Sequence, residues 1–175
     1  MTVEKRQKSI LIELEKADQP IVARKLAEKF SVSRQVIVGD IALLRAAGHE
    51  VLSTPKGYLL QSEWSTASKD VKRKFVCKHS IEETVDEINT IIQNGGKVID
   101  VAIEHPVYGE ITGTLNIFNQ ADADHFNEKV KKGETSLLSE LTEGVHLHTI
   151  AAETMEQLDL IEGKLSEKGY LYKSN

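Results

Sequence analysis

The chain has 175 residues, of which 40% are hydrophobic and 28% are charged; this is an ordinary globular composition that argues against disordered and low-complexity architectures. The formal net charge of −5 is unevenly spread, because residues 1–62 hold ten basic and seven acidic side chains whereas residues 63–175 hold twelve and twenty. A mildly basic front part joined to an acidic remainder indicates a nucleic-acid contact that is confined to the front.

The start of the chain, residues 1–8, is polar and lacks the apolar core of a signal peptide. No apolar run approaches the roughly 18 to 20 residues that a membrane-spanning helix needs. Cys77 is the single cysteine, which excludes an internal disulfide and a Cys-rich zinc finger. We therefore expect a cytoplasmic protein with no membrane partner.

Three amphipathic helices are predicted at the front of the chain. The spacing of the apolar residues places them over residues 3–17, 21–30 and 33–47. Ser33 is a suitable N-cap for the third helix, and Gly48 is a suitable stop at its end. Because only two residues separate the second helix from the third, the two must meet at a steep angle across a tight turn. This arrangement is typical of a helix-turn-helix.

A β-hairpin is predicted directly after the third helix. Two short β-capable runs, residues 50–53 and 58–60, flank the turn sequence Thr54-Pro55-Lys56-Gly57. Three helices closed by such a hairpin form a winged helix, which we assign to residues 1–62.

The first turn of the third helix carries the candidate DNA-reading residues. The major groove admits one helix whose N-terminal side chains meet the base edges. Arg34 can bond a guanine edge bidentately and Gln35 an adenine edge, while Ser33 can hold a phosphate. Lys56, at the tip of the hairpin, can reach a phosphate or the minor groove. A helical bundle with a merely solvated first turn is the alternative, and the hairpin argues against it.

This segment resembles a known DNA-binding domain. Its Val-Ser-Arg-Gln start and its Asp-Ile-x-x-Leu-Arg-x-x-Gly tail are similar to the helix-turn-helix domain at the front of biotin-repressor-like bacterial regulators. The resemblance covers about the first third of the chain and implies that the partner is a double-stranded DNA operator.

Strand and helix patterns alternate in the remainder of the chain. A polar stretch over residues 61–70 predicts a linker, which we place at residues 63–73. The predicted fold class is α+β: an N-terminal winged helix-turn-helix domain is followed by a mixed α/β sandwich domain over residues 74–175, with helices mostly on one face of the sheet. Strands are expected over residues 74–78, 97–104, 110–118, 144–150 and 170–173, and helices over residues 81–93, 122–131 and 154–168.

Histidines form the second group of candidate functional residues. His146 and His148 lie two apart in a strand pattern, so they project from the same face and can bind one ion. His79 ends the first strand of the second domain, and the next helix offers Glu83 and Glu87, one turn apart. A set of three histidines and one carboxylate suits Zn, Ni, Fe or Mn. The alternative is a half-exposed polar strand, and Cys77 is either a buried small residue or a minor metal candidate.

A family resemblance supports the metal interpretation. Residues 74–173 resemble the three-histidine domain of the nicotinate-responsive repressors of bacterial NAD biosynthesis, which also carry both domains in this order. The resemblance implies that His79, Glu87, His146 and His148 hold a divalent transition metal, preferably nickel or zinc, although the sequence leaves Glu83 open in place of Glu87. It also implies nicotinic acid as co-repressor. The motifs that carry it are Phe75-Val76-Cys77-Lys78-His79, Asp100-Val101-Ala102-Ile103-Glu104-His105-Pro106-Val107-Tyr108-Gly109 and Gly144-Val145-His146-Leu147-His148-Thr149.

Further expectations concern the effector, the oligomer and the class of protein. His105 and Tyr108 could line an effector pocket, or they could be ordinary turn residues. Two copies of the chain should bind together, because one winged helix buries little surface on DNA. The chain shows no phosphate loop and no pair of nucleophile and base, so we do not expect an enzyme. The family resemblance implies a repressor of NAD biosynthesis and niacin uptake genes. A metal-dependent hydrolase and a repressor that senses the metal itself are the alternatives.

Overall fold

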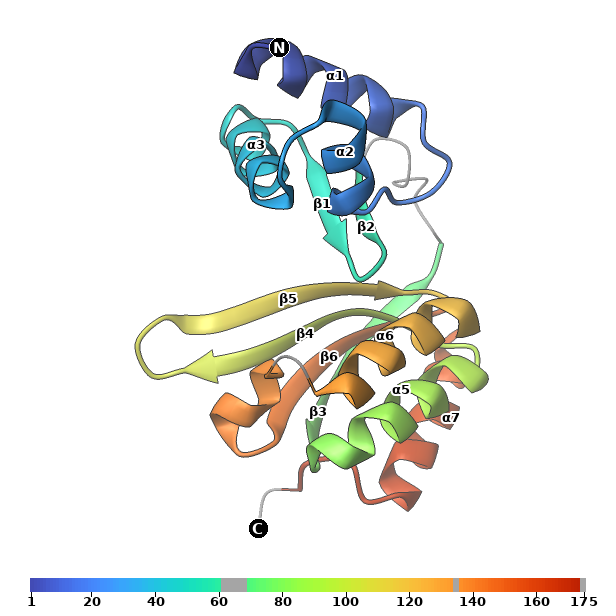
Figure 1. Ribbon diagram of the computed structural model, residues 1–175. Coiled ribbons are helices and arrows are strands. Elements are labelled where there is room, and N and C mark those ends of the chain that lie inside the picture. Colours follow the sequence, from blue (N-terminus) through green and yellow to red (C-terminus); the bar gives the residue numbers. More distant parts are fainter. Residues whose placement is uncertain (61–68, 134–135, 174–175) are drawn as a thin grey trace. The chain divides into compact units, whose positions relative to one another are not determined.

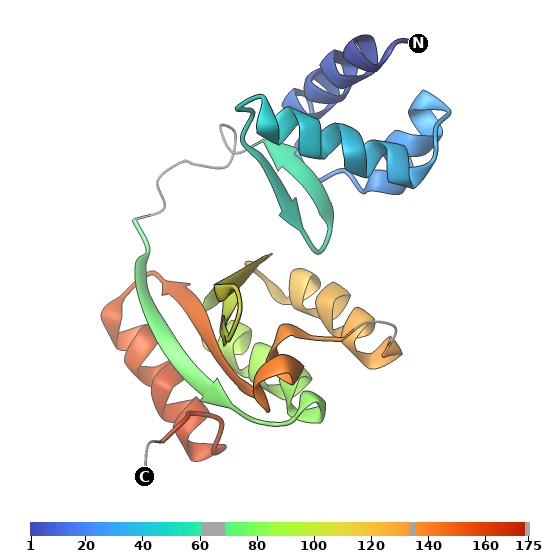
Figure 2. The ribbon, with the colours of Figure 1, turned by 90° about the vertical axis from the view of Figure 1, so that its left-hand side faces the viewer.

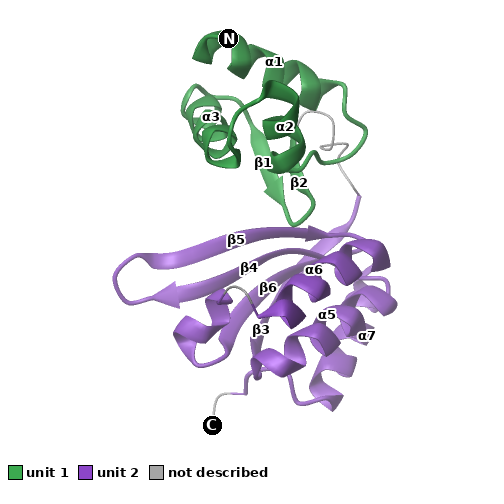
Figure 3. Cartoon of the chain, in the orientation of Figure 1, with its two compact units in different colours: residues 1–68 green, residues 69–175 purple. Residues whose placement is uncertain are grey.

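The computed structural model describes residues 1–60, 69–133 and 136–173. The chain divides into two compact units, Met1–Ser68 and Lys69–Asn175, which we call the front unit and the back unit (Figure 3). The predicted linker lies partly outside the described residues. Its last three positions, 71–73, belong to the first strand of the back unit.

Over its described residues, 1–60, the front unit contains three helices and a two-stranded antiparallel hairpin (Figure 1). The side chains of Thr2 and Ser33 cap helices α1 and α3, accepting from the backbone N–H three residues on. Its elements are α1 (Val3–Glu15), α2 (Ala23–Phe30), α3 (Arg34–Ala46), β1 (Val51–Thr54) and β2 (Gly57–Leu60).

Apolar side chains of all three helices and the hairpin form the core of the front unit. Ile10, Leu26 and Ile37 are almost completely buried there. Ile21 departs from the predicted second helix, because its backbone exchanges two hydrogen bonds with Tyr58 of β2. This bridge holds the segment between α1 and α2 in extended form, so α2 begins only at Ala23.

The back unit is a four-stranded antiparallel sheet in the order β3-β6-β4-β5. Its last strand in sequence, β6, lies inside the sheet between β3 and β4 (Figure 1; Figure 2). The elements are β3 (Val71–Lys78), a 3₁₀ turn η1 (Ile81–Glu83), α5 (Thr84–Gln93), β4 (Lys97–His105), β5 (Gly109–Ile117), α6 (Gln120–Lys132), a second 3₁₀ turn η2 (Leu138–Thr142), β6 (Val145–Ala152) and α7 (Met155–Glu167).

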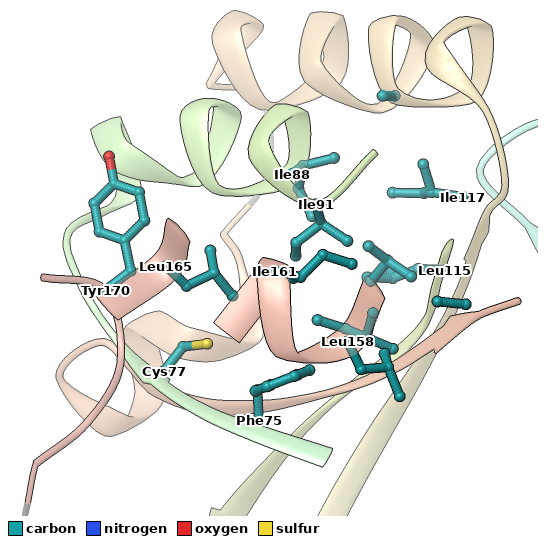
Figure 4. Packing of buried hydrophobic residues seen from close by; sticks show 14 residues of the cluster. Phe75, Cys77, Ile88, Ile91, Leu115, Ile117, Leu158, Ile161, Leu165 and Tyr170 are labelled. Atoms are coloured by element: carbon teal, nitrogen blue, oxygen red, sulfur yellow. The ribbon is translucent and has the colours of Figure 1, made fainter. Parts of the chain in front are cut away.

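Helices α5, α6 and α7 share one core with the sheet. Figure 4 shows Phe75 and Cys77 of β3 in the same cluster as Ile91 of α5 and Ile161 of α7. Side chains of a strand point alternately to its two faces, so every second side chain of β3 points to the helices. The positions on that side are buried or half-buried, and the positions between them are exposed.

Two parts of the back unit differ from the sequence prediction. The expected strand over residues 170–173 is a single bridge between Leu171 and Cys77, although backbone hydrogen bonds from Lys78 to Tyr170 and from Tyr172 to Val76 flank it. The turn η2 was not predicted, because its sequence lacks a clear period. In the part of the chain that the structure describes, no helix is long and apolar enough to cross a membrane.

Candidate functional site

Three histidine rings surround one carboxylate in the back unit. Glu87 of α5 has its Oε2 atom 2.7 Å from the Nε2 atom of His79, which follows β3. The Nε2 atoms of His146 and His148, both on β6, lie 3.4 and 3.5 Å from the Glu87 carboxylate oxygens. The fold thus gathers all four sequence-predicted ligands at one point, and all four side chains are buried.

The outer nitrogen of each ring is held by the backbone. The Nδ1 atoms of His79, His146 and His148 each lie 2.8 Å from a main-chain carbonyl, of Ser80, Gly144 and Asp100 respectively. A carbonyl oxygen can only accept, so Nδ1 must carry a proton in every ring. In a neutral imidazole, the Nε2 atom then carries no proton and has a free lone pair. Such anchoring of the outer nitrogen is typical of metal-binding histidines.

The cluster is therefore short of positive charge. No lysine or arginine among the described residues pairs with Glu87, whose side chain is completely buried. Burial opposes its charge, yet the charge of His148 and the contacts with the three rings hold the pKa of Glu87 well below its usual value. Burial likewise opposes charge on His79 and His148, but interaction with Glu87 outweighs it and raises the pKa of both. Protons on the rings, or a bound cation, must balance the carboxylate.

The donor set fits a divalent transition metal. Neutral imidazole and carboxylate are ordinary ligands of Zn, Ni, Fe and Mn. The buried Nε2 of His79 has no hydrogen-bond partner, although it lies close to Glu87. Cys77 also belongs to this neighbourhood, because potential ligand atoms of Cys77, Glu87 and His146 lie within 4.8 Å of one another. Burial raises the pKa of the Cys77 thiol, and the negative charge of Glu87 adds to the effect.

Local sequence explains why Glu87 rather than Glu83 reaches the histidines. The Glu83 carboxylate accepts hydrogen bonds from the backbone N–H and the hydroxyl of Ser80, which fixes it at the start of the helix. Glu87 comes one turn later and points into the cluster. Gly144 has a φ of +89°, and a Cβ atom there would lie 2.4 Å from the carbonyl oxygen of His79. Only glycine allows the two chain segments to approach this closely.

A cavity of about 220 Å³ adjoins the histidine cluster. His146, His148 and Glu87 line one side of it. Gly113 of β5 widens it, because a Cβ atom at this position would lie 3.4 Å from Leu138 and take up space at the wall. Thr84, Ser136 and Ser139 add polar groups to the lining. The apolar part of the wall comes from five different elements and one adjoining residue: Ile88, Val101, Leu115, Phe126, Leu137 and Leu138.

The predicted effector residues His105 and Tyr108 lie elsewhere. His105 ends β4 and Tyr108 lies in the turn between β4 and β5, and their rings stack with centroids 5.0 Å apart. Tyr108 is 76% exposed, and neither residue lines the cavity beside the histidines. The apolar residues of the cavity wall escaped the sequence analysis, because amphipathic spacing does not distinguish a cavity wall from an ordinary core position.

In the front unit, the predicted DNA-reading residues lie at the start of α3. Ser33 caps the helix by accepting from the Val36 N–H, and Arg34 and Gln35 are exposed in the first turn. Lys56 lies in the turn between β1 and β2 and is half-buried.

Two arginines that the sequence analysis did not single out position these elements. Arg6 of α1 donates to the buried Asp40 of α3 at 2.5 and 3.2 Å, which fixes α3 against α1. Arg45 of α3 donates to the Val51 carbonyl and the Ser53 hydroxyl at 2.8 and 2.6 Å, which ties the hairpin to the same helix. These contacts set the mutual orientation of α3 and the hairpin, the two elements that carry the predicted DNA-reading residues.

Comparison with known proteins agrees with the two units. The 3H domain family matches residues 72–174, and an HTH domain family matches residues 6–59. The chain is 40% identical over 168 residues to the probable transcription repressor NiaR of Thermotoga maritima, which covers 96% of this chain and 94% of that protein. It is 36% identical over 168 residues to the transcription repressor NadR of Bacillus subtilis, covering 96% and 93%. The matches confirm the predicted fold class.

Proposed function

Because this chain belongs to the family of transcription repressors that join an HTH domain to a 3H domain, we propose that it represses genes of NAD biosynthesis and niacin uptake with nicotinic acid as co-repressor. The relatives are named repressors, which confirms the prediction of a DNA-binding regulator rather than an enzyme. The proposal adds a divalent transition metal in the back unit, a double-stranded DNA operator and a homodimer.

The observation that carries the proposal is the charge deficit around Glu87. His79, His146 and His148 would hold the metal together with this carboxylate, because their Nε2 lone pairs converge on it while their Nδ1 atoms are anchored to carbonyls. When bound, the metal supplies Lewis acidity, the capacity to accept an electron pair from a nitrogen or oxygen of the effector. Nickel and zinc fit this donor set best, and iron and manganese are compatible with it.

The shape and lining of the adjoining cavity support a small aromatic acid as effector. Apolar side chains such as Phe126 and Leu138 can enclose a six-membered ring, while the polar side with His146 and His148 faces its substituent. A pyridine carboxylate matches a cavity with an apolar and a polar side, since its ring carbons are apolar while its carboxylate and its ring nitrogen can each donate an electron pair to a metal. Gly113 leaves the space that the ring would take.

Nicotinic acid would act by shifting a population. An effector that binds the DNA-competent arrangement more tightly than the incompetent one raises the fraction of the former. Arg34 and Gln35 would then read base edges of the operator in the major groove. Ser33 would hold a phosphate, and Lys56 would reach a phosphate or the minor groove. Two copies reading half-sites about one helical turn apart would supply the specificity.

Calorimetric titration of the full chain with nicotinate, before and after treatment with a chelator, tests the proposal. We expect binding to the metal-loaded protein and a large loss of affinity after chelation, with recovery when the metal is restored. Nicotinamide, which lacks the carboxylate, and benzoate, which lacks the ring nitrogen, test the two donor groups. Binding that is indifferent to the chelator would overturn the role of the metal.

A cavity-filling variant tests the location of the effector. Gly113→Val places a branched side chain against Leu138 and Val101, so nicotinate affinity should fall at least tenfold while metal content stays the same. Gly163→Val on α7, where nothing lies within 4 Å of an added Cβ atom, is the matched control. Equal nicotinate affinity in the two variants would remove the cavity from the proposal.

A further inference from the structure

The face of the back-unit sheet opposite the helices carries an ordered pattern of charge. Along β3, the side chains of Phe75 and Cys77 enter the core, so the alternate positions, Lys72, Lys74, Val76 and Lys78, lie on the other side and are exposed. We call this side of the sheet the open face. Val76 is 39% exposed, which is high for an apolar residue in a strand.

The strand register extends the pattern across the sheet. Val76 pairs with Leu147 of β6, Leu147 with Ala102 of β4, and Ala102 with Thr112 of β5, which gives an uncharged central row. One row further along, Lys78 pairs with Val145, and Glu104 pairs with Glu110. Paired residues share a face, so both rows belong to the open face.

Opposite charges therefore occupy opposite edges of one surface. The β3 edge presents Lys74 and Lys78, and the β4–β5 edge presents Glu104 and Glu110. All four side chains are exposed, and none of them forms an ion pair with a described residue. Partly exposed apolar residues of β6, Val145 and Leu147, lie between the two edges.

We propose that the open face is the contact through which two copies of this chain form the dimer, with a twofold axis that runs parallel to the strands. The inference rests on the proposed dimeric repressor and specifies the surface that it uses. Rotation about such an axis exchanges the two edges of the sheet. Each row of paired residues keeps its position along the strand direction, so it faces the same row of the other copy. Lys78 of one copy then faces Glu110 of the other, Leu147 faces Ala102, and Val76 faces Thr112.

Charge selects this axis over the alternative. A twofold axis across the strands would keep each edge opposite itself, so the lysines of β3 in one copy would face the lysines of β3 in the other, and Glu104 would face Asp100. Like charges placed in contact are unfavourable, and such repulsion suppresses wrong arrangements. The surface is complementary to itself in one orientation only, as an isologous contact requires.

The size of the open face sets the expected strength of the contact. Four strands spaced about 4.8 Å apart and eight residues at about 3.3 Å each give a flat area of roughly 500 Å², which is below the about 800 Å² per partner of a standard interface. We therefore expect a dimer of moderate affinity that weakens at high salt, because the facing charges lie at the rim and are exposed.

Charge exchange between two variants tests the proposal. Lys78→Glu and Glu110→Lys should each raise the dimer dissociation constant of the full chain at least tenfold in sedimentation equilibrium. An equimolar mixture of the K78E and E110K chains should recover near wild-type affinity as a mixed dimer, because both facing pairs then have opposite charges again. Lys132→Glu at the exposed end of α6 is the control and should leave dimerisation unchanged, and circular dichroism should show that every variant is folded.

Each other result has a definite meaning. If K78E and E110K dimerise like the wild type, the open face is not the contact, whereas the repressor with its metal and effector stands. Two weakened variants that fail to recover in the mixture would overturn the axis parallel to the strands. A wild-type chain that is monomeric at all accessible concentrations would overturn the dimer itself, and the operator and nicotinate titrations would still decide the proposed function.

Discussion

Removing the divalent metal with a chelator should lower the melting temperature of the back unit, and restoring it should raise the melting temperature again. The physical reason is the arrangement of His79, His146 and His148, whose Nε2 atoms converge on the buried carboxylate of Glu87. These ligands come from three separate segments of the chain, so an ion that binds all of them stabilises the folded state over the unfolded one.

The magnitude follows from the size of the back unit. At a free metal concentration one hundredfold above its dissociation constant, binding adds about 2.7 kcal/mol to the free energy of unfolding. The back unit extends over Lys69–Asn175, and at about 2.1 cal/mol/K per residue its entropy of unfolding is roughly 0.22 kcal/mol/K. The expected rise in melting temperature is therefore about 12 °C.

Ligand variants sharpen this expectation. His146→Ala or His148→Ala removes one of four donors, and a hundredfold loss of metal affinity would reduce the rise to about 2 °C at the same metal concentration. His49→Ala, at an exposed histidine of the front unit, is the matched control and should keep the full rise. The difference between metal-loaded and metal-free samples of each variant is the quantity to compare, since a buried substitution also alters the metal-free protein.

Differential scanning calorimetry of the full chain, together with elemental analysis, checks the reasoning. Protein purified without chelators or affinity tags should carry about one equivalent of metal per chain, as one ion in the cluster around Glu87 requires. If no metal is found, and added Ni, Zn, Fe and Mn leave the melting temperature unmoved, the cluster is a structural feature that is balanced by protons alone. The same result would remove the metal from the proposed effector mechanism.

Arg34→Ala should weaken binding to the specific operator by about 1–3 kcal/mol in fluorescence anisotropy, the usual value of a bidentate base contact; unchanged affinity would exclude Arg34 from the readout. Lys56→Ala should weaken binding to operator and random DNA alike and reduce the salt dependence by about one phosphate contact; an unaltered salt slope would contradict this role. Burial opposes charge on His79 and His148, but interaction with Glu87 outweighs it and raises the pKa of both. The protonated rings therefore stabilise the metal-free fold. This stabilisation is complete below the usual pKa of 6.5 and is lost as pH rises through the folded-state pKa. Metal competes with these protons, so the metal-induced rise in melting temperature should grow over the same interval, and a rise that shrinks with increasing pH would refute the competition.

Local patterns were sufficient to predict most elements of the fold. The helical spacing in α1 and the capping role of Ser33 follow from side-chain chemistry within a few residues. The position of β6 between β3 and β4 depends on pairings between residues far apart in the sequence, and no local pattern contains that information. Ile21 shows the same limit, because its extended backbone depends on Tyr58, which comes much later in the chain.

The candidate ligands were easier to find than the cavity beside them. His146 and His148 share a face because side chains in a strand alternate, a rule that holds whatever the tertiary structure. The choice of Glu87 over Glu83 required the structure, since it depends on the hydrogen bonds that Glu83 makes with Ser80. Phe126 becomes a cavity wall only through the packing of α6 against distant elements, so its sequence context gave no signal.

Strand β6 joins the candidate metal centre to the open face. Successive side chains of a strand point to opposite faces, so His146 and His148 face the helices while Val145 and Leu147 face the other side. If the histidines bind the metal and the open face forms the dimer, any ligand that changes the position or order of β6 acts on both surfaces at once. The coupling must then be reciprocal: whatever factor the metal contributes to dimer affinity, dimerisation contributes to metal affinity. An effector could in this way control the pairing of two DNA-binding units without touching either of them.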